Sequence, residues 1–176
     1  MRVIGGEFRS RRLKTLPGMA LRPTPDRLRE TLFDVLAPRI AGTVFLDAYA
    51  GSGAVGIEAL SRGAARAIFI ENHRGAVEVI HQNLKSLGLE ARAEVLRRKA
   101  LVALPHCEAG IVFLDPPYDQ TREYDAALLL LGESPPALAI AQHPARFALK
   151  DDYGHLHRLR LLRQGDNALS LYEPAE

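Results

Sequence analysis

The chain has 176 residues, of which 47% are apolar and 25% are charged, a composition typical of one globular domain or of one domain with a small appendage. A single cysteine excludes a disulfide framework and a zinc site of the CxxC type, and no apolar run is longer than six residues, which excludes a membrane-spanning helix. The formal net charge is only +2 and the N-terminus has no apolar signal-peptide region, so we expect a soluble, cytoplasmic protein.

Basic residues are concentrated at the N-terminus, where residues 1–25 carry six basic side chains and one acidic one. Such a block is a common footprint of contact with nucleic-acid phosphates, and a solvated surface is the alternative. Partial alternation in RVIGGEF and SRRLKTL predicts a small β-hairpin before a linker rich in proline and glycine over Leu16–Pro25. We expect an RNA-binding extension over residues 1–22 and a second domain over residues 23–176. The candidate RNA-binding residues are Arg9, Arg11, Arg12, Lys14 and Arg22.

A helix is predicted to begin at Pro25, where the missing N–H has no cost, with Thr24 as its cap. Apolar residues recur at helical spacing up to Leu36, and Arg27 and Arg29 fall on the opposite, polar face.

From residue 43 onward, short apolar strands alternate with amphipathic helices. Strands are expected over residues 43–48, 66–71, 91–97, 110–115 and 137–142. Helices are expected between them: one ends near residue 62, and three others span about residues 75–87, 99–104 and 124–131. This alternation predicts an α/β fold with a mostly parallel sheet that is covered on both faces. Two last strands, 156–162 and 168–172, flank a polar turn and predict an antiparallel hairpin at one edge.

A glycine-rich turn follows the first predicted strand. The run Gly51–Gly56 matches GxGxxG, opens a helix, and has Glu71 twenty residues after its first glycine. That spacing is typical of a nucleotide-binding turn, and a tight turn without a ligand is the alternative. Asp47 precedes the turn by four residues; its carboxylate would repel the pyrophosphate of NAD and attract the ammonium group of a methionine moiety. The sequence therefore favours S-adenosylmethionine, with Glu71 accepting hydrogen bonds from ribose hydroxyls.

The tetrapeptide Asp115-Pro116-Pro117-Tyr118 directly follows the fourth predicted strand. An amine conjugated to a ring is a poor nucleophile until acceptors hold its hydrogens. The Asp115 carboxylate and the Pro116 carbonyl, whose direction the proline ring restrains, can accept both N–H bonds and stabilise the charge that develops. Tyr118 offers a ring on which a base can stack. A mere strand stop is the alternative.

Four blocks of the sequence resemble the RsmD-type bacterial 16S rRNA guanine-N2 methyltransferases. They are Arg22–Phe33, Asp47–Ala64, Asp115–Tyr118 and Gly165–Tyr172. The resemblance implies a Rossmann-like class I methyltransferase fold with seven strands, the last of them antiparallel, and a small N-terminal extension that contacts RNA. It implies methyl transfer from S-adenosylmethionine to N2 of a guanine, with ribosomal RNA or the small ribosomal subunit as partner. We expect a monomer without a metal.

The matching motif positions imply a set of site residues. Catalysis is expected at Asp115, Pro116, Pro117 and Tyr118, and cofactor binding at Asp47, Ala50, Gly51, Ser52, Gly53, Glu71, Asn72, Ala100 and Thr24. Three positions depart from the family pattern: Lys99 stands where an acidic residue is usual, His73 replaces an aspartate, and Gln142 replaces a glutamate. Other hypotheses are methylation of DNA adenine N6 or of a protein glutamine, an RNA-binding module with a vestigial site, and an NAD-dependent oxidoreductase.

Overall fold

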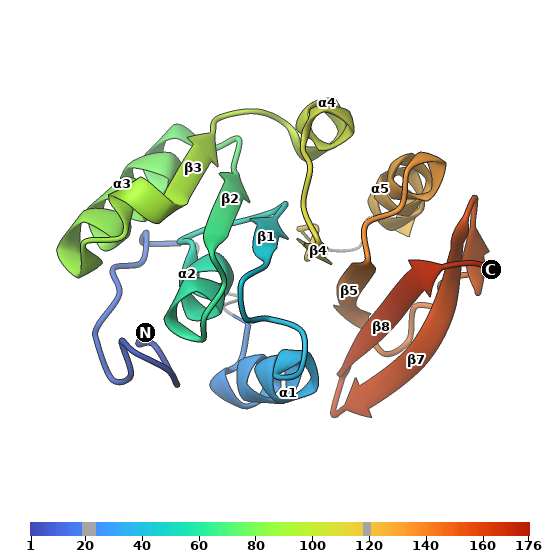
Figure 1. The fold of residues 1–176 in the computed structure, drawn as a ribbon, viewed down its shortest axis with the longest axis horizontal. Helices are drawn as coiled ribbons and strands as arrows, with labels where there is room; N and C mark the ends of the chain where they lie inside the picture. Colours follow the sequence, from blue (N-terminus) through green and yellow to red (C-terminus); the bar gives the residue numbers. More distant parts are fainter. Residues whose placement is uncertain (19–23, 118–120) are drawn as a thin grey trace.

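One twisted sheet runs through the molecule, with helices on both of its faces (Figure 1). The computed structural model describes residues 1–18, 24–117 and 121–176. Within these residues the sheet has eight strands in the order β3-β2-β1-β4-β5-β8-β7-β6. The strands are β1 (Val44–Asp47), β2 (Arg66–Ile70), β3 (Ala93–Leu96), β4 (Ile111–Leu114), β5 (Leu138–Pro144), β6 (Asp152–Tyr153), β7 (Leu156–Gln164) and β8 (Asn167–Pro174).

The sheet is parallel from β3 to β5 and antiparallel from β5 to β6. In the parallel part the carboxyl ends of the strands meet at one edge, which is where ligands of such sheets bind. The predicted mostly parallel sheet with an antiparallel last strand is therefore confirmed. The two-residue strand β6 is an eighth strand beyond the seven expected. It covers only the first two residues of β7, so within the described residues the rest of that strand has an open edge.

The helices divide the core into two layers. Buried side chains of α1 (Asp26–Leu36), α2 (Ala54–Ser61) and α3 (Arg74–Leu87) pack on one face of the sheet, and those of α4 (Ala100–Ala103) and α5 (Thr121–Glu133) pack on the other. Figure 1 shows α1 and α5 on opposite sides of the strands. Short 3-10 helices at Glu90–Arg92 and Leu104–His106 complete the connections. Strand and helix positions thus agree with the expected alternation.

The expected N-terminal β-hairpin is present in a short form. It has one antiparallel bridge, between Arg2 and Arg12, with backbone hydrogen bonds from Val3 N–H to the Arg11 carbonyl and from Leu13 N–H to the Met1 carbonyl. One local expectation was wrong. Thr24 does not cap α1; the N-cap is Pro25, and no described side chain caps this helix end.

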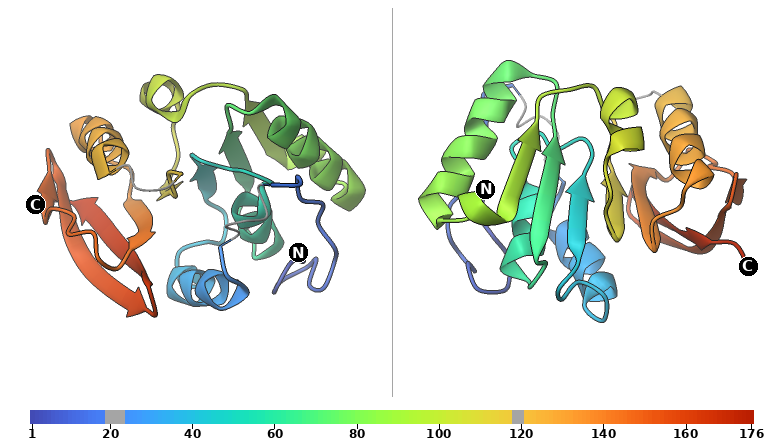
Figure 2. Two further views of the ribbon diagram at one scale, coloured as in Figure 1. Left: turned by 180° about the vertical axis from the view of Figure 1, so that it is seen from behind. Right: turned by 45° about the horizontal axis from the view of Figure 1, so that its top comes forward.

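Residues 1–16, called here the N-terminal segment, lie along α2 and α3, at the opposite end of the sheet from the β7–β8 hairpin (Figure 2). The buried Glu58 carboxylate of α2 accepts hydrogen bonds from the backbone N–H groups of Ile4 and Gly5, each at 2.9 Å. It also pairs with Arg62 at 2.9 Å and with Arg29 at 3.7 Å. Arg29 is fully buried, not exposed as predicted, because the buried Glu58 carboxylate provides its counterion.

Candidate active site

A cavity of about 430 Å³ opens at the carboxyl ends of β1 and β4. It lies at the edge of the parallel sheet where the sequence predicts the ligand, and it brings together the glycine turn, the first turn of α1 and part of the N-terminal segment. Its lining residues are Met1, Thr15, Leu16, Thr24, Pro25, Asp26, Asp47, Tyr49, Ala50, Gly51, Ser52, Ala54, Val55, Phe113 and Asp115.

The glycine turn needs its glycines for two different reasons. Gly53 is the N-cap of α2 with φ of 85°, a left-handed conformation that side chains disfavour. Gly56 lies against the ring of Phe69 in β2, and a Cβ at Gly56 would stand 2.3 Å from Phe69 Cε1. The turn is thus shaped for a sharp reversal and for close packing of helix on strand. The amide of Gly51 donates to Glu71 at 2.7 Å, which ties the turn to the end of β2.

Asp47 is the acidic group at the base of the cavity. It is 1% exposed and accepts a hydrogen bond from the Gly56 N–H at 3.1 Å. Burial is the main cause that raises the pKa of Asp47 to about 7; the Gly56 N–H lowers this pKa, and the nearby carboxylates of Asp115 and Glu71 contribute to raising it. A ligand with a positive charge would stabilise the ionised form of this carboxylate, and an anionic ligand would oppose it.

The N-terminus of α2 supplies the opposite polarity. Ala54 and Val55 of its first turn line the cavity, and the N-cap glycine brings no capping side chain. The first amides of a helix and the positive end of its dipole attract anions. The cavity therefore presents a carboxylate and a helix N-terminus within one wall, an arrangement that matches the ammonium and carboxylate groups of an amino acid.

The predicted catalytic tetrapeptide lies at the same edge as far as it is described. The Asp115 side chain lines the cavity, Pro116 is buried and Pro117 is exposed. Tyr118 lies outside the described residues. The cavity thus joins the predicted acceptor carboxylate to the predicted cofactor turn.

Gln142 is a polar residue at the end of β5, the strand beside β4. Leu114 of β4 pairs with Ala141 of β5, so Asp115 and Gln142 are the residues that follow this last pair on the two neighbouring segments. Gln142 is 7% exposed, and its Oε1 atom has no hydrogen-bond partner among the described residues. A buried acceptor without a partner is costly and calls for a donor from elsewhere.

Tyr49 connects the cofactor turn to the far helical layer. It lines the cavity, and its hydroxyl donates to Glu123 of α5 at 2.7 Å. Burial and this hydrogen bond raise the pKa of Tyr49 well above its ordinary value. Tyr49 therefore acts as a neutral hydroxyl that holds the loop after β1 against α5.

Of the remaining predicted cofactor residues, Thr24 lines the cavity, and Gly53, Glu71, Asn72 and Ala100 are not among its lining residues. Glu71 accepts hydrogen bonds from Gly51 and from His73 N–H, one on each carboxylate oxygen, and Asn72 next to it is exposed. Ala100 is the buried first residue of α4. His73 caps α3 through Nδ1, which accepts from Ala76 N–H at 3.2 Å, the role an aspartate would have there.

The four described candidates for RNA binding, Arg9, Arg11, Arg12 and Lys14, are exposed. Arg11 donates to the carbonyl of Ser86 near the end of α3, and the neighbouring loop bonds to Ser61 at the end of α2, so Arg9 and Arg11 lie at the far end of these helices from the cavity. Arg12 is exposed at the bridge with Arg2, and Lys14 directly precedes the cavity lining. Arg22 lies outside the described residues.

Sequence reasoning missed the contribution of the N-terminal segment to the cavity, since nothing in Met1, Thr15 or Leu16 signals it. It also missed Asn83, a buried polar side chain behind the glycine turn. A signal for it exists: Asn83 falls on the apolar face of α3, between Ile80 and Leu87.

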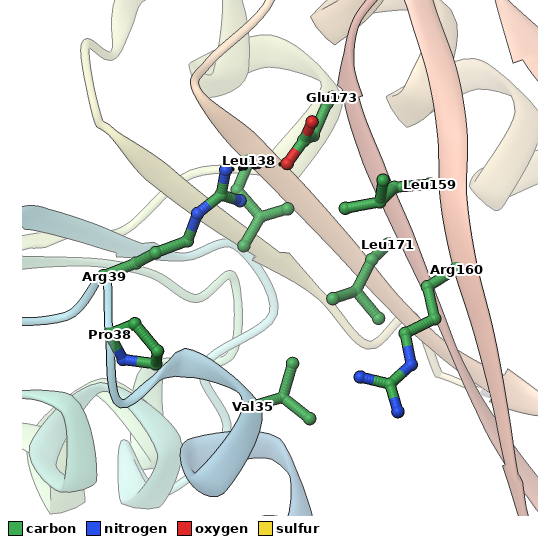
Figure 3. A pocket seen from close by; sticks show the side chains of 8 residues that line it. All are labelled: Val35, Pro38, Arg39, Leu138, Leu159, Arg160, Leu171 and Glu173. Atoms are coloured by element: carbon green, nitrogen blue, oxygen red, sulfur yellow. Dashed lines mark hydrogen bonds and ion pairs between the residues drawn. The ribbon is translucent and has the colours of Figure 1, made fainter.

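A second hollow of about 300 Å³ lies between the end of α1 and the antiparallel part of the sheet (Figure 3). Leu138, Leu159 and Leu171 form its apolar floor, and Arg39 and Glu173 pair across one side at 2.6 Å. None of the predicted site residues lines it. The described residues contain no group of three or more His, Cys, Asp or Glu side chains placed to hold a metal, and no helix among them is long and apolar enough to cross a membrane.

Comparison with known proteins identifies relatives along nearly the whole chain. The family model described as "Conserved hypothetical protein 95" matches residues 1–173. The Bacillus subtilis protein YlbH is 36% identical over 98% of both chains. The Ribosomal RNA small subunit methyltransferase D of Escherichia coli is 46% identical over 123 residues, which are 67% of this chain and 60% of that relative.

Solved structures agree with the predicted fold. A Salinibacter ruber RNA methyltransferase in complex with S-adenosyl-L-homocysteine matches with a TM-score of 0.71, over 88% of this chain and 95% of that one. Its sequence identity is 20%, so this likeness shows the fold alone. The expected class I fold is thereby confirmed.

Proposed function

We propose that this protein methylates the exocyclic N2 amine of a guanine in 16S rRNA. The chain belongs to the family described as Conserved hypothetical protein 95 and is an S-adenosylmethionine-dependent rRNA methyltransferase. The observation that carries the proposal is the single cavity at the carboxyl edge, which places Asp47, the glycine turn and Asp115 side by side. The printed name of the Escherichia coli relative, a small subunit methyltransferase, supports the class of RNA.

The residues of the cavity fit S-adenosylmethionine. Asp47 would pair with its ammonium group, the first amides of α2 would receive its carboxylate, and Glu71 would accept hydrogen bonds from its ribose. The carboxylates at Asp47 and Asp115 also suit a sulfonium and would oppose the pyrophosphate of NAD. When bound, the cofactor supplies a methyl group on a sulfonium that leaves as a neutral thioether.

Asp115 and the Pro116 carbonyl would hold the acceptor amine. Each can accept one N–H of the amine, which directs the nitrogen lone pair toward the methyl group and favours a pyramidal nitrogen. As the N–C bond forms the nitrogen becomes positive, and both hydrogen bonds strengthen, so the two acceptors stabilise the transition state more than the ground state. The amine then loses one proton to solvent. In this scheme Tyr118 stacks on the base, a role that rests on the sequence.

The choice of guanine is supported by Gln142. Beside its N2 amine a guanine carries a second donor, the ring N1–H, whereas the ring nitrogens beside the adenine N6 amine are acceptors. Gln142 Oε1 is a buried acceptor, and Gln142 and Asp115 each follow the last residue pair between β4 and β5. A guanine that presents its amine to Asp115 would offer N1–H to this oxygen. An adenine would leave the oxygen without a partner.

The experiment is transfer of labelled methyl groups from S-adenosylmethionine to 16S rRNA and to 30S subunits, followed by nucleoside analysis. The proposal predicts N2-methylguanosine as the labelled product. Labelled N6-methyladenosine, or label in protein glutamine, would replace the proposal by one of the alternative acceptors. Cofactor binding without any transfer would indicate a vestigial site.

A further inference from the structure

The side chain of Asn83 in α3 forms hydrogen bonds with both the N-terminal segment and the glycine turn. Its Oδ1 accepts the backbone N–H of Lys14 at 2.7 Å. Its Nδ2 donates to the carbonyl of Lys14 at 3.0 Å and to the carbonyl of Ser52 at 3.0 Å. One amide therefore uses both of its donor hydrogens and its acceptor on two backbone segments that are far apart in the sequence.

Both segments held by Asn83 are walls of the cavity. Ser52 belongs to the glycine turn and lines the cavity, and so do Thr15 and Leu16, which follow Lys14 directly. Asn83 itself is 1% exposed and does not line the cavity. Its hydrogen bonds thus set the distance between two cofactor-facing walls without contact to the ligand.

The rest of the N-terminal segment is fixed to the outer ends of α2 and α3. Glu58 and Ser61 bind its backbone at Ile4, Gly5 and Phe8, and Arg11 bonds to the carbonyl of Ser86. Val3 and Leu13 are buried in the core. Its arginines, in contrast, are exposed. The exposed arginines therefore belong to a packed segment that leads directly to Lys14 and Asn83.

We propose that Asn83 is a positioning residue that couples RNA contact by the N-terminal segment to cofactor binding, an inference that rests on the proposed rRNA methyltransferase function. RNA phosphates bound by the exposed arginines would restrain the segment, and with it the cavity wall at Thr15 and Leu16. A wall that is already ordered costs less conformational entropy when the cofactor binds. RNA therefore raises cofactor affinity, and by linkage the cofactor raises RNA affinity by the same factor.

The test measures the dissociation constant of S-adenosylhomocysteine with and without 16S rRNA, in the wild-type protein and in Asn83→Asp. The aspartate keeps the size of the side chain and the acceptor for Lys14 N–H, but it loses both donor hydrogens. Gln82→Glu is the matched control, because it makes the same chemical change on the exposed neighbouring residue of α3. Asn83→Ser, which retains one hydroxyl donor, serves if Asn83→Asp does not fold.

In the wild-type protein and in Gln82→Glu, we expect RNA to tighten S-adenosylhomocysteine binding by about fivefold or more, the usual range for coupled sites. In Asn83→Asp the ratio should fall to within about twofold of one, and Asn83→Ser should be intermediate. A wild-type ratio of one, or a full ratio in the folded Asn83 variants, overturns the inference. Methylation of 16S rRNA by the wild-type protein is scored separately, so a wild-type enzyme that methylates RNA but shows no coupling refutes only the role of Asn83.

Discussion

The affinity for the cofactor should depend on pH through Asp47. In the free protein this buried carboxyl has its pKa raised to about 7 by burial and by the neighbouring carboxylates. A bound ammonium group would hold the same carboxyl ionised, so binding must release a proton whenever the solution is more acidic than about pH 7. The ligand's own amino group titrates at about 7.7–8.0 and stays protonated over that range.

The magnitude follows from the protonated fraction of the free protein. Half of the Asp47 carboxyls are protonated at a pH equal to the pKa, and nearly all are protonated 1.5 units below it. The dissociation constant of S-adenosylhomocysteine should therefore rise roughly fifteen-fold when the pH falls from about 7 to about 5.5. Calorimetric titration in buffers of different ionisation enthalpy measures both the affinity and the proton released.

Asp47→Asn is the control for effects of pH that do not come from Asp47. The amide should bind the ligand about ten- to a hundred-fold more weakly at pH 7, because a charged hydrogen bond is lost, and its affinity should not change with pH through this site. A flat wild-type profile would refute the reasoning, as would an Asp47→Asn profile with the wild-type slope.

The same raised pKa has an effect on stability. Between the ordinary aspartate value of 3.8 and about 7, the folded protein binds a proton at Asp47 that the unfolded chain does not bind. The free energy of unfolding should therefore decrease as the pH rises through this window. A bound ammonium group removes that penalty, so the ligand should raise the melting temperature more at pH 7 than at pH 5.

Four further variants test other parts of the site and the fold. Asp115→Asn should retain S-adenosylhomocysteine affinity and lower kcat by at least about a hundred-fold in single-turnover methylation, since the stabilisation of the positive nitrogen is lost; near wild-type turnover would contradict the amine-holding mechanism. Gln142→Leu should lower kcat/KM for 16S rRNA about ten-fold or more without change in cofactor affinity. A kcat/KM equal to that of the wild-type protein would show that Gln142 does not recognise the base. Glu58→Gln should lower the free energy of unfolding in urea by about 3–5 kcal/mol, because buried Arg29 loses its counterion; a loss below about 1 kcal/mol would show that the pair is dispensable. A triple alanine variant should bind rRNA more weakly, with a salt slope smaller by up to about two to three units, and an unchanged slope would show that the segment does not contact phosphates. The arginines replaced in that variant are Arg9, Arg11 and Arg12.

The sequence was most informative where local pattern decides structure. Alternating strands and helices predicted the parallel sheet, and parallel sheets align the carboxyl ends of their strands. Asp47 and Asp115 could therefore be assigned to one site although they are far apart in the chain, and both line the cavity. The glycine pattern predicted the turn because its steric requirements are local.

Features that depend on tertiary contacts could not be predicted in this way. Arg29 was assigned to a solvated helix face, since its partner Glu58 comes from another helix that had to be placed first. Likewise, the N-terminal segment has no pattern that indicates where it packs, so the contribution of Thr15 and Leu16 to the cavity was missed.

The open edge of β7 has a consequence for self-association. Beyond Arg158, whose N–H bonds to the Asp151 carbonyl, the strand presents backbone N–H and C=O groups on its outer side among the described residues, a template on which a second chain could add a strand. Arg160 and Arg163 are exposed on this stretch, beside the exposed Leu159. When two copies approach edge to edge, their guanidinium groups repel each other before the backbones can pair. Replacing these arginines by β-branched residues would remove that repulsion and favour aggregation through the edge strand.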